Sequence, residues 1–292
     1  MIKHQDGIVI VAVLWICALI MWLSLQIGAE TRLQADERVH LLRQTQALYL
    51  ATGGAFEALA RMGEPISLER EDDTENASWQ PDGTIHEVAY RTGRAIVTIQ
   101  KETDKVNVNE ATQEQIKAVL EKIGLEDDQA DTLADFIADF VDPDDTPRLN
   151  GAEEDYYKNE GLRYVPFNNK LTSIDQLLLV PGITQQLFYG FDLGAGEAEA
   201  EGESSEYPLL TGKDSLFQMF TIYGNNVSFE DEEILEQAKG EMDYVTWEAN
   251  GTYRILSCGK LSSGSPSVTL WLIVRYTPES QSGYEVLYRK IL

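Results

Sequence analysis

Residues 8–27 form an unbroken apolar run that begins directly after Gly7, with only seven residues ahead of it. A helix of this length spans roughly 30 Å, the thickness of the hydrocarbon core of a bilayer. Its polar side chains, Ser24 and Gln26, both lie near its far end. A secretory signal peptide has a shorter apolar region and then a small-residue cleavage site, which residues 25–29 match poorly. The run therefore predicts a membrane-spanning helix.

The chain continues from this run to Met62 without a proline. Apolar residues recur roughly three and four positions apart, with charged residues on the other faces, which is the pattern of an amphipathic helix. Gly53-Gly54 interrupts the pattern and predicts a weak point, where the helix could bend. A continuous helix over residues 8–62 would be roughly 80 Å long, half in lipid and half outside.

The composition limits the classes of partner. The chain carries a formal net charge of −26 and its pI is about 4.3. Nucleic acid is a poor partner for such a surface, because phosphate contacts need a face of lysine and arginine. Cys17 and Cys258 lie far apart, which argues against an intrachain disulfide. Lys3, ahead of the apolar run, weakly favours an N-terminus inside the cell.

The soluble part alternates between strand and helix patterns. Residues 83–101 have period-two alternation around Thr92-Gly93 and predict a β-hairpin. Residues 106–192 change to helical periodicity, with helices expected from about 111 to 124, over 128–141 and from Ser173 as N-cap. Residues 244–292 return to strands. The simplest architecture is an α+β domain on the long helix, with a helical insertion between the two halves of its sheet.

An acidic segment over residues 142–155 is the best candidate for a binding site. Against a calcium loop, Asp142, Asp144, Thr146 and Asn150 fall at positions one, three, five and nine, and Glu153 at twelve. Pro147 stands where an EF-hand requires glycine, so the segment is not an EF-hand. Hard oxygen ligands here predict calcium, with an ordinary solvated loop as the alternative. The candidate ligands are Asp142, Asp144, Asp145, Asn150, Glu153 and Asp155.

Two short motifs, at residues 106–112 and around Val180-Pro-Gly-Ile183, are similar to helix-hairpin-helix elements, which offer backbone N–H groups to a phosphate. Their surroundings are acidic, so a packing role is favoured over DNA binding. The three histidines, His4, His40 and His86, lie far apart without a nucleophile nearby. The sequence therefore predicts no enzyme and no organic cofactor.

A family resemblance covers nearly the whole chain. The leader ending in Gly7 and the apolar run from Ile8 resemble a prepilin signal, and the remainder resembles the K-type minor pseudopilin of the type II secretion system. The segments that carry it are RAIVTIQKETDKVNVNEAT, DFIADFVDPDDTPRLNGAEEDYY and LTSIDQLLLVPGITQQLFYG. The acidic stretch over residues 193–206 departs from the family pattern.

The resemblance implies specific processing. A prepilin peptidase would cut between Gly7 and Ile8 and methylate the new amino terminus at Ile8. The fifth mature residue is then Ala12, where most pilins carry a glutamate that pairs with the amine of a neighbouring subunit. Because an unpaired carboxylate in lipid is costly, the absence of glutamate fits a subunit at the tip, where one neighbour is missing. The K-type family shares this absence, and it is also known for calcium in its helical domain.

The resemblance implies a pilin-like α+β fold with a large all-α insertion. The expected divisions are a leader (1–7), a spine helix (8–62, with 8–27 transmembrane), a first pilin-like part (63–105), a helical insertion (106–192), an acidic loop (193–206) and a second pilin-like part (207–292).

The expected role is a non-enzymatic tip subunit that promotes pseudopilus initiation and export of folded proteins. Its expected location is the bacterial inner membrane with a periplasmic C-terminal domain, and its expected partners are the I- and J-type minor pseudopilins, the major pseudopilin and the prepilin peptidase. Two alternatives stay open: a tip pilin of a type IV pilus, serving adhesion or DNA uptake, and a membrane-tethered DNA receptor.

Overall fold

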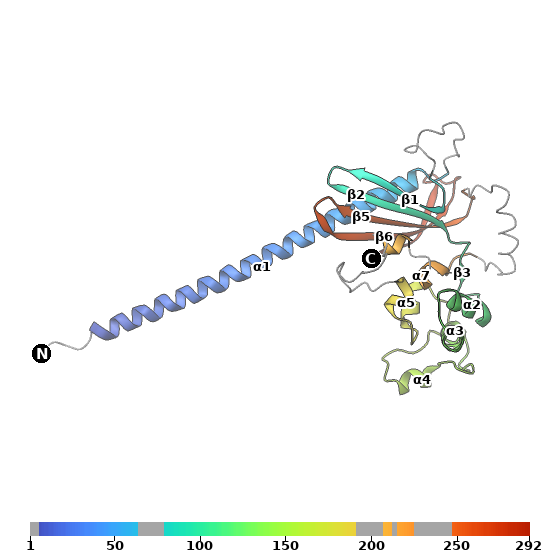
Figure 1. Cartoon of the computed structure of the whole chain (residues 1–292), viewed down its shortest axis with the longest axis horizontal. Coiled ribbons are helices and arrows are strands. Elements are labelled where there is room, and N and C mark those ends of the chain that lie inside the picture. The colour runs from blue at the N-terminus through green and yellow to red at the C-terminus, as the bar shows by residue number, and fades with distance from the viewer. Residues whose placement is uncertain (1–5, 64–78, 191–206, 212–214, 225–246) are drawn as a thin grey trace.

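A computed structural model describes residues 6–63, 79–190, 207–211, 215–224 and 247–292. One long helix leads into a head that contains a sheet and a group of short helices (Figure 1). The leader residues 1–5 and the predicted acidic loop over 193–206 lie outside the described residues.

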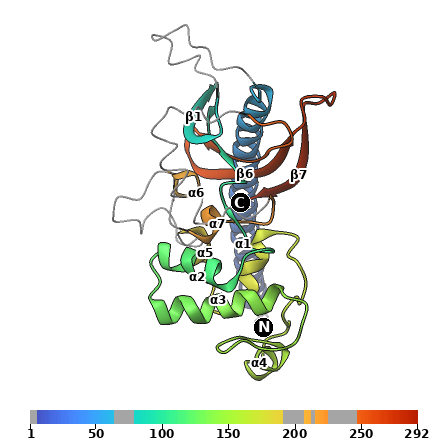
Figure 2. The same cartoon turned by 90° about the vertical axis from the view of Figure 1, so that its right-hand side faces the viewer.

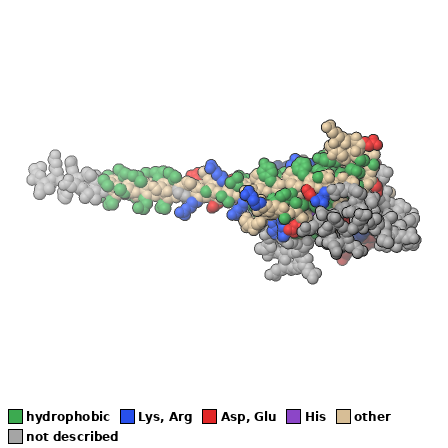
Figure 3. Space-filling model, turned by 90° about the horizontal axis from the view of Figure 1, so that it is seen from above, with side chains coloured by type: hydrophobic (Ala, Val, Ile, Leu, Met, Phe, Trp, Pro, Cys, Tyr) green, Lys and Arg blue, Asp and Glu red, His purple; other side chains and the backbone are tan. Residues whose placement is uncertain are grey.

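The long helix is α1 (Asp6–Ala60), which the sequence predicted over nearly the same residues. Its apolar side chains between Val11 and Ile27 are exposed. Within the described residues, α1 is the one helix long and apolar enough to cross a membrane. Seen from above, apolar side chains cover this first half, and charged side chains appear along the middle (Figure 3). The chain therefore has an N-terminal helix suited to anchoring it in a membrane.

The second half of α1 packs on the sheet through small residues. Ala47, Ala51, Ala55 and Ala58 recur on one face of the helix and are almost completely buried. Gly54 lies on the same face, and a Cβ there would come within 2.6 Å of both the Ala95 Cβ and the Ser257 Oγ. The weak point predicted at Gly53-Gly54 does not end the helix, because α1 runs through both residues without interruption. Gly54 serves close contact between helix and sheet.

The sheet has five antiparallel strands in the order β1-β2-β5-β6-β7. Its strands are β1 (Asp82–Tyr90), β2 (Gly93–Lys101), β5 (Thr252–Leu261), β6 (Gly264–Tyr276) and β7 (Tyr284–Ile291). The predicted hairpin at Thr92-Gly93 is confirmed by the pairing of Tyr90 with Gly93. The two ends of the chain's soluble part meet where Val97 of β2 pairs with Ser257 of β5.

Short helices and a second small sheet lie between these strands in sequence. The elements are β3 (Val106–Asn107), α2 (Gln113–Lys122), α3 (Asp127–Val141), α4 (Glu154–Asn159), the 3-10 helix η2 (Ile174–Leu179), α5 (Gln185–Tyr189), α6 (Pro208–Thr211), α7 (Leu216–Met219) and β4 (Phe220–Thr221). β3 and β4 pair in parallel. Helix α2 begins as predicted, because the Thr112 side chain caps it in a capping box with Gln115.

The sheet separates two apolar clusters. Alternate residues of β2 point to opposite faces, so Val97 and Ile99 pack with α1, whereas Ile96 belongs to the cluster with the short helices. Trp271 of β6 joins this second cluster, together with Phe217 of α7 at 4.7 Å between ring centroids. The head is thus layered as α1, sheet and short helices, as the two views show (Figures 1 and 2).

Candidate functional site

The predicted acidic segment connects α3 to α4. Asp142 is the C-cap residue of α3, and Glu153 is the N-cap residue of α4. The chain between them folds back on α3, because the Asn150 backbone N–H donates to Asp135 Oδ2 at 3.0 Å. Gly151 is required for this return, since a Cβ there would overlap Asp139 Oδ2 and come within 2.7 Å of the Arg148 nitrogen. The loop therefore places its oxygen atoms against the end of α3.

Arg148 joins two of these carboxylates. Its Nη1 donates to Asp139 Oδ1 and, at 2.5 Å, to Asp142 Oδ2. Its backbone N–H also donates to Asp139 Oδ2 at 3.1 Å. Burial raises the pKa of Asp139, although Arg148 opposes this effect. One guanidinium thus stands between two carboxylates on successive turns of the chain.

Glu153 has no such partner. The residue is only 6% exposed, and neither carboxylate oxygen has a hydrogen-bond partner among the described residues. Burial raises the pKa of Glu153 to about 7, and the nearby charges of Asp139, Asp142 and Asp145 add to that effect. The Asn168 side chain lies close enough to oppose it. A buried carboxylate among other carboxylates is costly unless a cation or a proton accompanies it.

The structure separates the six predicted ligands. Glu153 and Asp142 lie in the cluster around Asp139, while Asp145 approaches it and accepts a bond from Asn168 Nδ2 at 2.7 Å. The other three are directed elsewhere. Asp144 Oδ1 accepts from the Thr146 backbone N–H, the Asn150 side chain reaches toward Asp131, and Asp155 is exposed on α4.

Sequence reasoning missed three residues of this cluster: Asp139, Arg148 and Asn168. Asp139 could have been found from the sequence, because Asp135, Asp139 and Asp142 are spaced four and three residues apart and so fall on one face of a helix. The calcium-loop pattern considers only oxygen ligands and so gives no role to Arg148. Asn168 lies outside the segment 142–155 that was compared with a calcium loop.

The oxygen-rich chemistry of this cluster fits a hard divalent cation such as calcium. Unpartnered buried oxygens belong to Asp142, Glu153 and Asn168. Across the described ranges, however, no three acidic, histidine or cysteine side chains already converge as ligands of one ion. The cluster has the donors for a cation, with Arg148 in contact with two of them.

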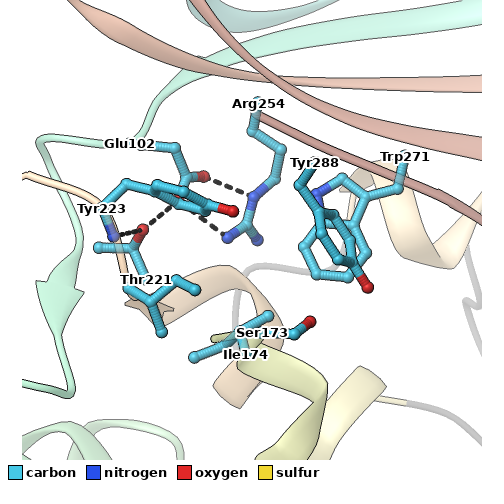
Figure 4. A pocket seen from close by; sticks show the side chains of 9 residues that line it. Glu102, Ser173, Ile174, Thr221, Tyr223, Arg254, Trp271 and Tyr288 are labelled. Carbon is cyan, nitrogen blue, oxygen red and sulfur yellow. Dashed lines mark hydrogen bonds and ion pairs between the residues drawn. The ribbon is translucent and has the colours of Figure 1, made fainter. Parts of the chain in front are cut away.

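A second buried polar cluster joins the sheet to the short helices (Figure 4). Arg254 of β5 and Glu102, which directly follows β2, are both fully buried and paired, with Nε 2.5 Å from Oε1. Thr221 of β4 donates to Glu102, and Arg254 donates to the Phe217 and Phe220 carbonyl groups. The space among these residues is too small for a ligand. This cluster fixes one layer of the head to the next.

Lys105 completes that cluster. Its Nζ lies 3.5 Å from Glu102 Oε1 and donates to Gln100 Oε1 at 2.8 Å. Burial lowers the pKa of Lys105 to about 7, with a further contribution from the charge of Arg254. A single carboxylate therefore faces two buried cationic side chains.

The second motif that resembled a DNA-binding hairpin is packed inside the head. Val180 and Ile183 are buried, and Gly182 between them adopts a φ of +91°. A Cβ on Gly182 would come within 3.4 Å of Leu133 Cδ1 in α3. This turn thus lies against α3.

The long anchoring helix, the antiparallel sheet packed on its second half and the added helical layer define an α+β protein of pilin-like construction. The family comparison is more specific. Residues 94–190 match the model of type II secretion system protein K. Over these residues the chain is similar to the protein K family, which is the resemblance that the sequence predicted.

Several curated relatives carry the same description. Type II secretion system protein K of Klebsiella pneumoniae is 27% identical over 197 residues, which cover 63% of this chain and 60% of the relative. The putative protein K of Escherichia coli K12 is 26% identical over 133 residues, 45% of this chain and 40% of the relative. Protein K of Pectobacterium carotovorum is 32% identical over 72 residues, 25% of this chain and 22% of the relative. The chain thus spans at most 60% of the length of these relatives.

A solved structure was also found, the GspK-GspI-GspJ complex of the type 2 secretion system from enterotoxigenic Escherichia coli. The matched chain is 15% identical with a TM-score of 0.49, and the match covers 90% of this chain and 99% of that one.

Proposed function

We propose that this protein is a minor pseudopilin at the tip of a type II secretion pseudopilus, where it promotes filament initiation and export of folded proteins. The observation that carries the proposal is the layered head on an exposed apolar helix. The first half of α1 has no covering within the described residues, so it is free to enter a membrane or a bundle of helices. The outer face of the sheet is covered by the helical layer, which would hinder addition of a further subunit there.

Cleavage and methylation of the N-terminus are part of the same proposal. A prepilin peptidase would cut between Gly7 and Ile8 and methylate Ile8, and both residues lie within α1. Before assembly, the chain would be anchored in the bacterial inner membrane with its head in the periplasm. Helices of other subunits would then replace lipid contacts as it enters the filament.

The proposed partners are the I- and J-type minor pseudopilins and the major pseudopilin. Beyond the membrane segment, Leu42, Tyr49 and Phe56 lie at seven-residue intervals on α1 and are 63%, 73% and 59% exposed. Such spacing places the three on nearly one face of the helix. Large apolar side chains on the exposed face of the helix mark a surface for another helix.

Calcium is proposed for the α3–α4 cluster. The residues that would hold it are Glu153, Asp142, Asp139 and Asn168, with Asp145 close by. Bound calcium supplies positive charge and accepts oxygen ligands. The buried Glu153 carboxylate would then be neutralised, and the loop that connects α3 to α4 would be held in one arrangement.

Complementation of secretion tests the proposed function. A strain that lacks this protein should stop exporting its type II substrates, and the intact chain should restore export. A variant with Leu42→Glu, Tyr49→Glu and Phe56→Glu should restore little, because it charges the proposed helix surface. Gln44→Glu, on a different exposed face of α1, is the matched control and should restore export fully.

Export that is unaffected by loss of the protein would contradict the proposal. If the purified chain then bound duplex DNA in a salt-sensitive manner, the DNA-receptor alternative would take its place. Loss of twitching or adhesion without a secretion defect would instead indicate a tip pilin of a type IV pilus.

A further inference from the structure

We propose that Arg148 is an internal counter-ion that a divalent cation must displace from Asp139 and Asp142, so that this one side chain sets the cation affinity of the helical layer. The inference rests on the calcium site proposed above and concerns a residue that neither the calcium-loop pattern nor the family match singled out.

The first observation is that Arg148 is bound to the cluster through both its side chain and its backbone. Its Nη1 bonds to the carboxylates of Asp139 and Asp142, and its own backbone N–H bonds to the second oxygen of Asp139. Asp139 is completely buried, whereas the side chain of Arg148 is 36% exposed. A buried carboxylate is therefore neutralised by a guanidinium that can still reach solvent.

The second observation is the set of oxygen atoms left over. Asp142 Oδ1, Glu153 Oε1, Glu153 Oε2 and Asn168 Oδ1 are buried and have no hydrogen-bond partner. Calcium takes about six to eight oxygen ligands. The two carboxylate oxygens bonded to Nη1 of Arg148 belong to residues of the same cluster and are further candidate donors. A cation that recruits these two carboxylates must therefore take oxygens that Arg148 now occupies.

The third observation is that a groove with an acidic residue lies beside Arg148 and could accept a displaced guanidinium. Arg148 also lines a groove of about 670 Å³ between the start of α2 and the end of α3. Glu114, in the first turn of α2, lines the same groove and is already influenced by the charge of Arg148. A cation at Asp139 and Asp142 would repel the guanidinium, and Glu114 offers it a new partner. Cation binding and the Arg148 ion pairs are thus mutually exclusive.

Calorimetric titration of the full chain in detergent with calcium chloride tests the inference. The unaltered chain should bind calcium, and Arg148→Met should bind it at least about tenfold more tightly, because no ion pair must be broken. Lys170→Met is the matched control. Lys170 lines the same groove and, within the part of the chain that the structure describes, forms an ion pair with exposed Glu110 at 3.6 Å, so its loss should change the affinity by less than about twofold. Glu153→Gln should abolish the heat of calcium binding, which would place the bound calcium at the cluster between α3 and α4.

Unchanged or weaker calcium binding by Arg148→Met overturns the inference, as does an absence of binding by the unaltered chain. Circular dichroism confirms that each variant is folded. If Arg148→Met is not, Arg148→Gln, which also removes the positive charge but keeps a polar head group, should still bind calcium more tightly, and unchanged affinity there overturns the inference as well. The export assay separates this result from the proposed function, because a chain that restores export but shows no Arg148 effect contradicts only the counter-ion role.

Discussion

Glu102 Oε1 and Arg254 Nε lie 2.5 Å apart and are both buried, although their residues are separated by 152 positions in the chain. The guanidinium also packs on the Phe217 ring, 4.5 Å from its centroid, and donates to the carbonyl groups of Phe217 in α7 and of Phe220 directly after it. Figure 4 shows the pair of Arg254 and Glu102. The end of β2, strand β5 and the helical layer thus meet at one ion pair. The ion pair therefore links the sheet to the helical layer that covers it.

Removing one member of this pair should destabilise the head. Glu102→Gln leaves the Arg254 guanidinium buried without a counter-charge, and we expect a loss of about 3–5 kcal/mol in the free energy of unfolding. Urea unfolding followed by tryptophan fluorescence measures it. The exposed pair of Arg275 and Glu285, at 3.0 Å, provides the control, and Glu285→Gln should cost less than about 1 kcal/mol. Equal losses in the two variants would contradict this role of the buried pair.

A pH effect should follow from Lys105. Its pKa is lowered to about 7 by burial, whereas the unfolded chain keeps this amine protonated to about pH 10. Between these values the unfolded state binds the extra proton, so this residue makes stability increase as the pH rises above 7. Thermal unfolding from pH 6 to pH 9 should show a smaller increase for Lys105→Met than for the unaltered chain. Lys101→Met, which breaks the solvent-accessible contact to Glu248, should retain the full increase. Parallel curves for all three would refute the assignment.

The contact between α1 and the sheet should be intolerant of added volume. A Cβ on Gly259 of β5 would overlap the Ala47 carbonyl oxygen and come within 2.6 Å of the Ala51 nitrogen. Because these are backbone atoms of a helix, they cannot move alone, and Gly259→Ala should cost about 1–3 kcal/mol of stability. Urea unfolding checks this, with the exposed turn residue Ser262→Ala as the control. An unchanged unfolding midpoint for Gly259→Ala would show that the helix can shift away.

Ala12 offers a test of the tip position. In a subunit that lacks one neighbour, Ala12→Glu would place a carboxylate in lipid without a partner, which is costly. We expect a lower level of the protein in membranes and less export, measured by immunoblotting and by the secreted fraction of a substrate. Ala12→Gln controls for size and should have a much smaller effect. Normal abundance and unchanged order of assembly for Ala12→Glu would remove the support that Ala12 gives to a tip position.

Local patterns predicted the elements well. Alternation of apolar and polar residues in 83–101 predicted the hairpin, and helical periodicity from about residue 111 predicted α2. Ser173 also caps a helix with Gln176, but the chain there forms the 3-10 helix η2. Capping chemistry indicates where a helix begins and not which hydrogen-bond pattern follows, so this detail was beyond the sequence.

Contacts between distant residues could not be predicted in the same way. Glu102 and Arg254 become partners only because β2 pairs with β5, and that pairing is a property of the whole sheet. Spacing within residues 142–155 nominated Asp144 and Asn150, whose side chains turn to other partners. Asp139 and Asn168 enter the cluster through the folding of the loop against α3. Which oxygen atoms of an acidic loop share one space is a tertiary property.

The mass and sequence of the mature N-terminus, from protein isolated from native membranes, test the central claim most directly. Intact-mass measurement and fragmentation should find a chain that begins at Ile8 and carries one added methyl group on its amine. A functional chain that still begins at Met1 would contradict its assignment as a processed pseudopilin.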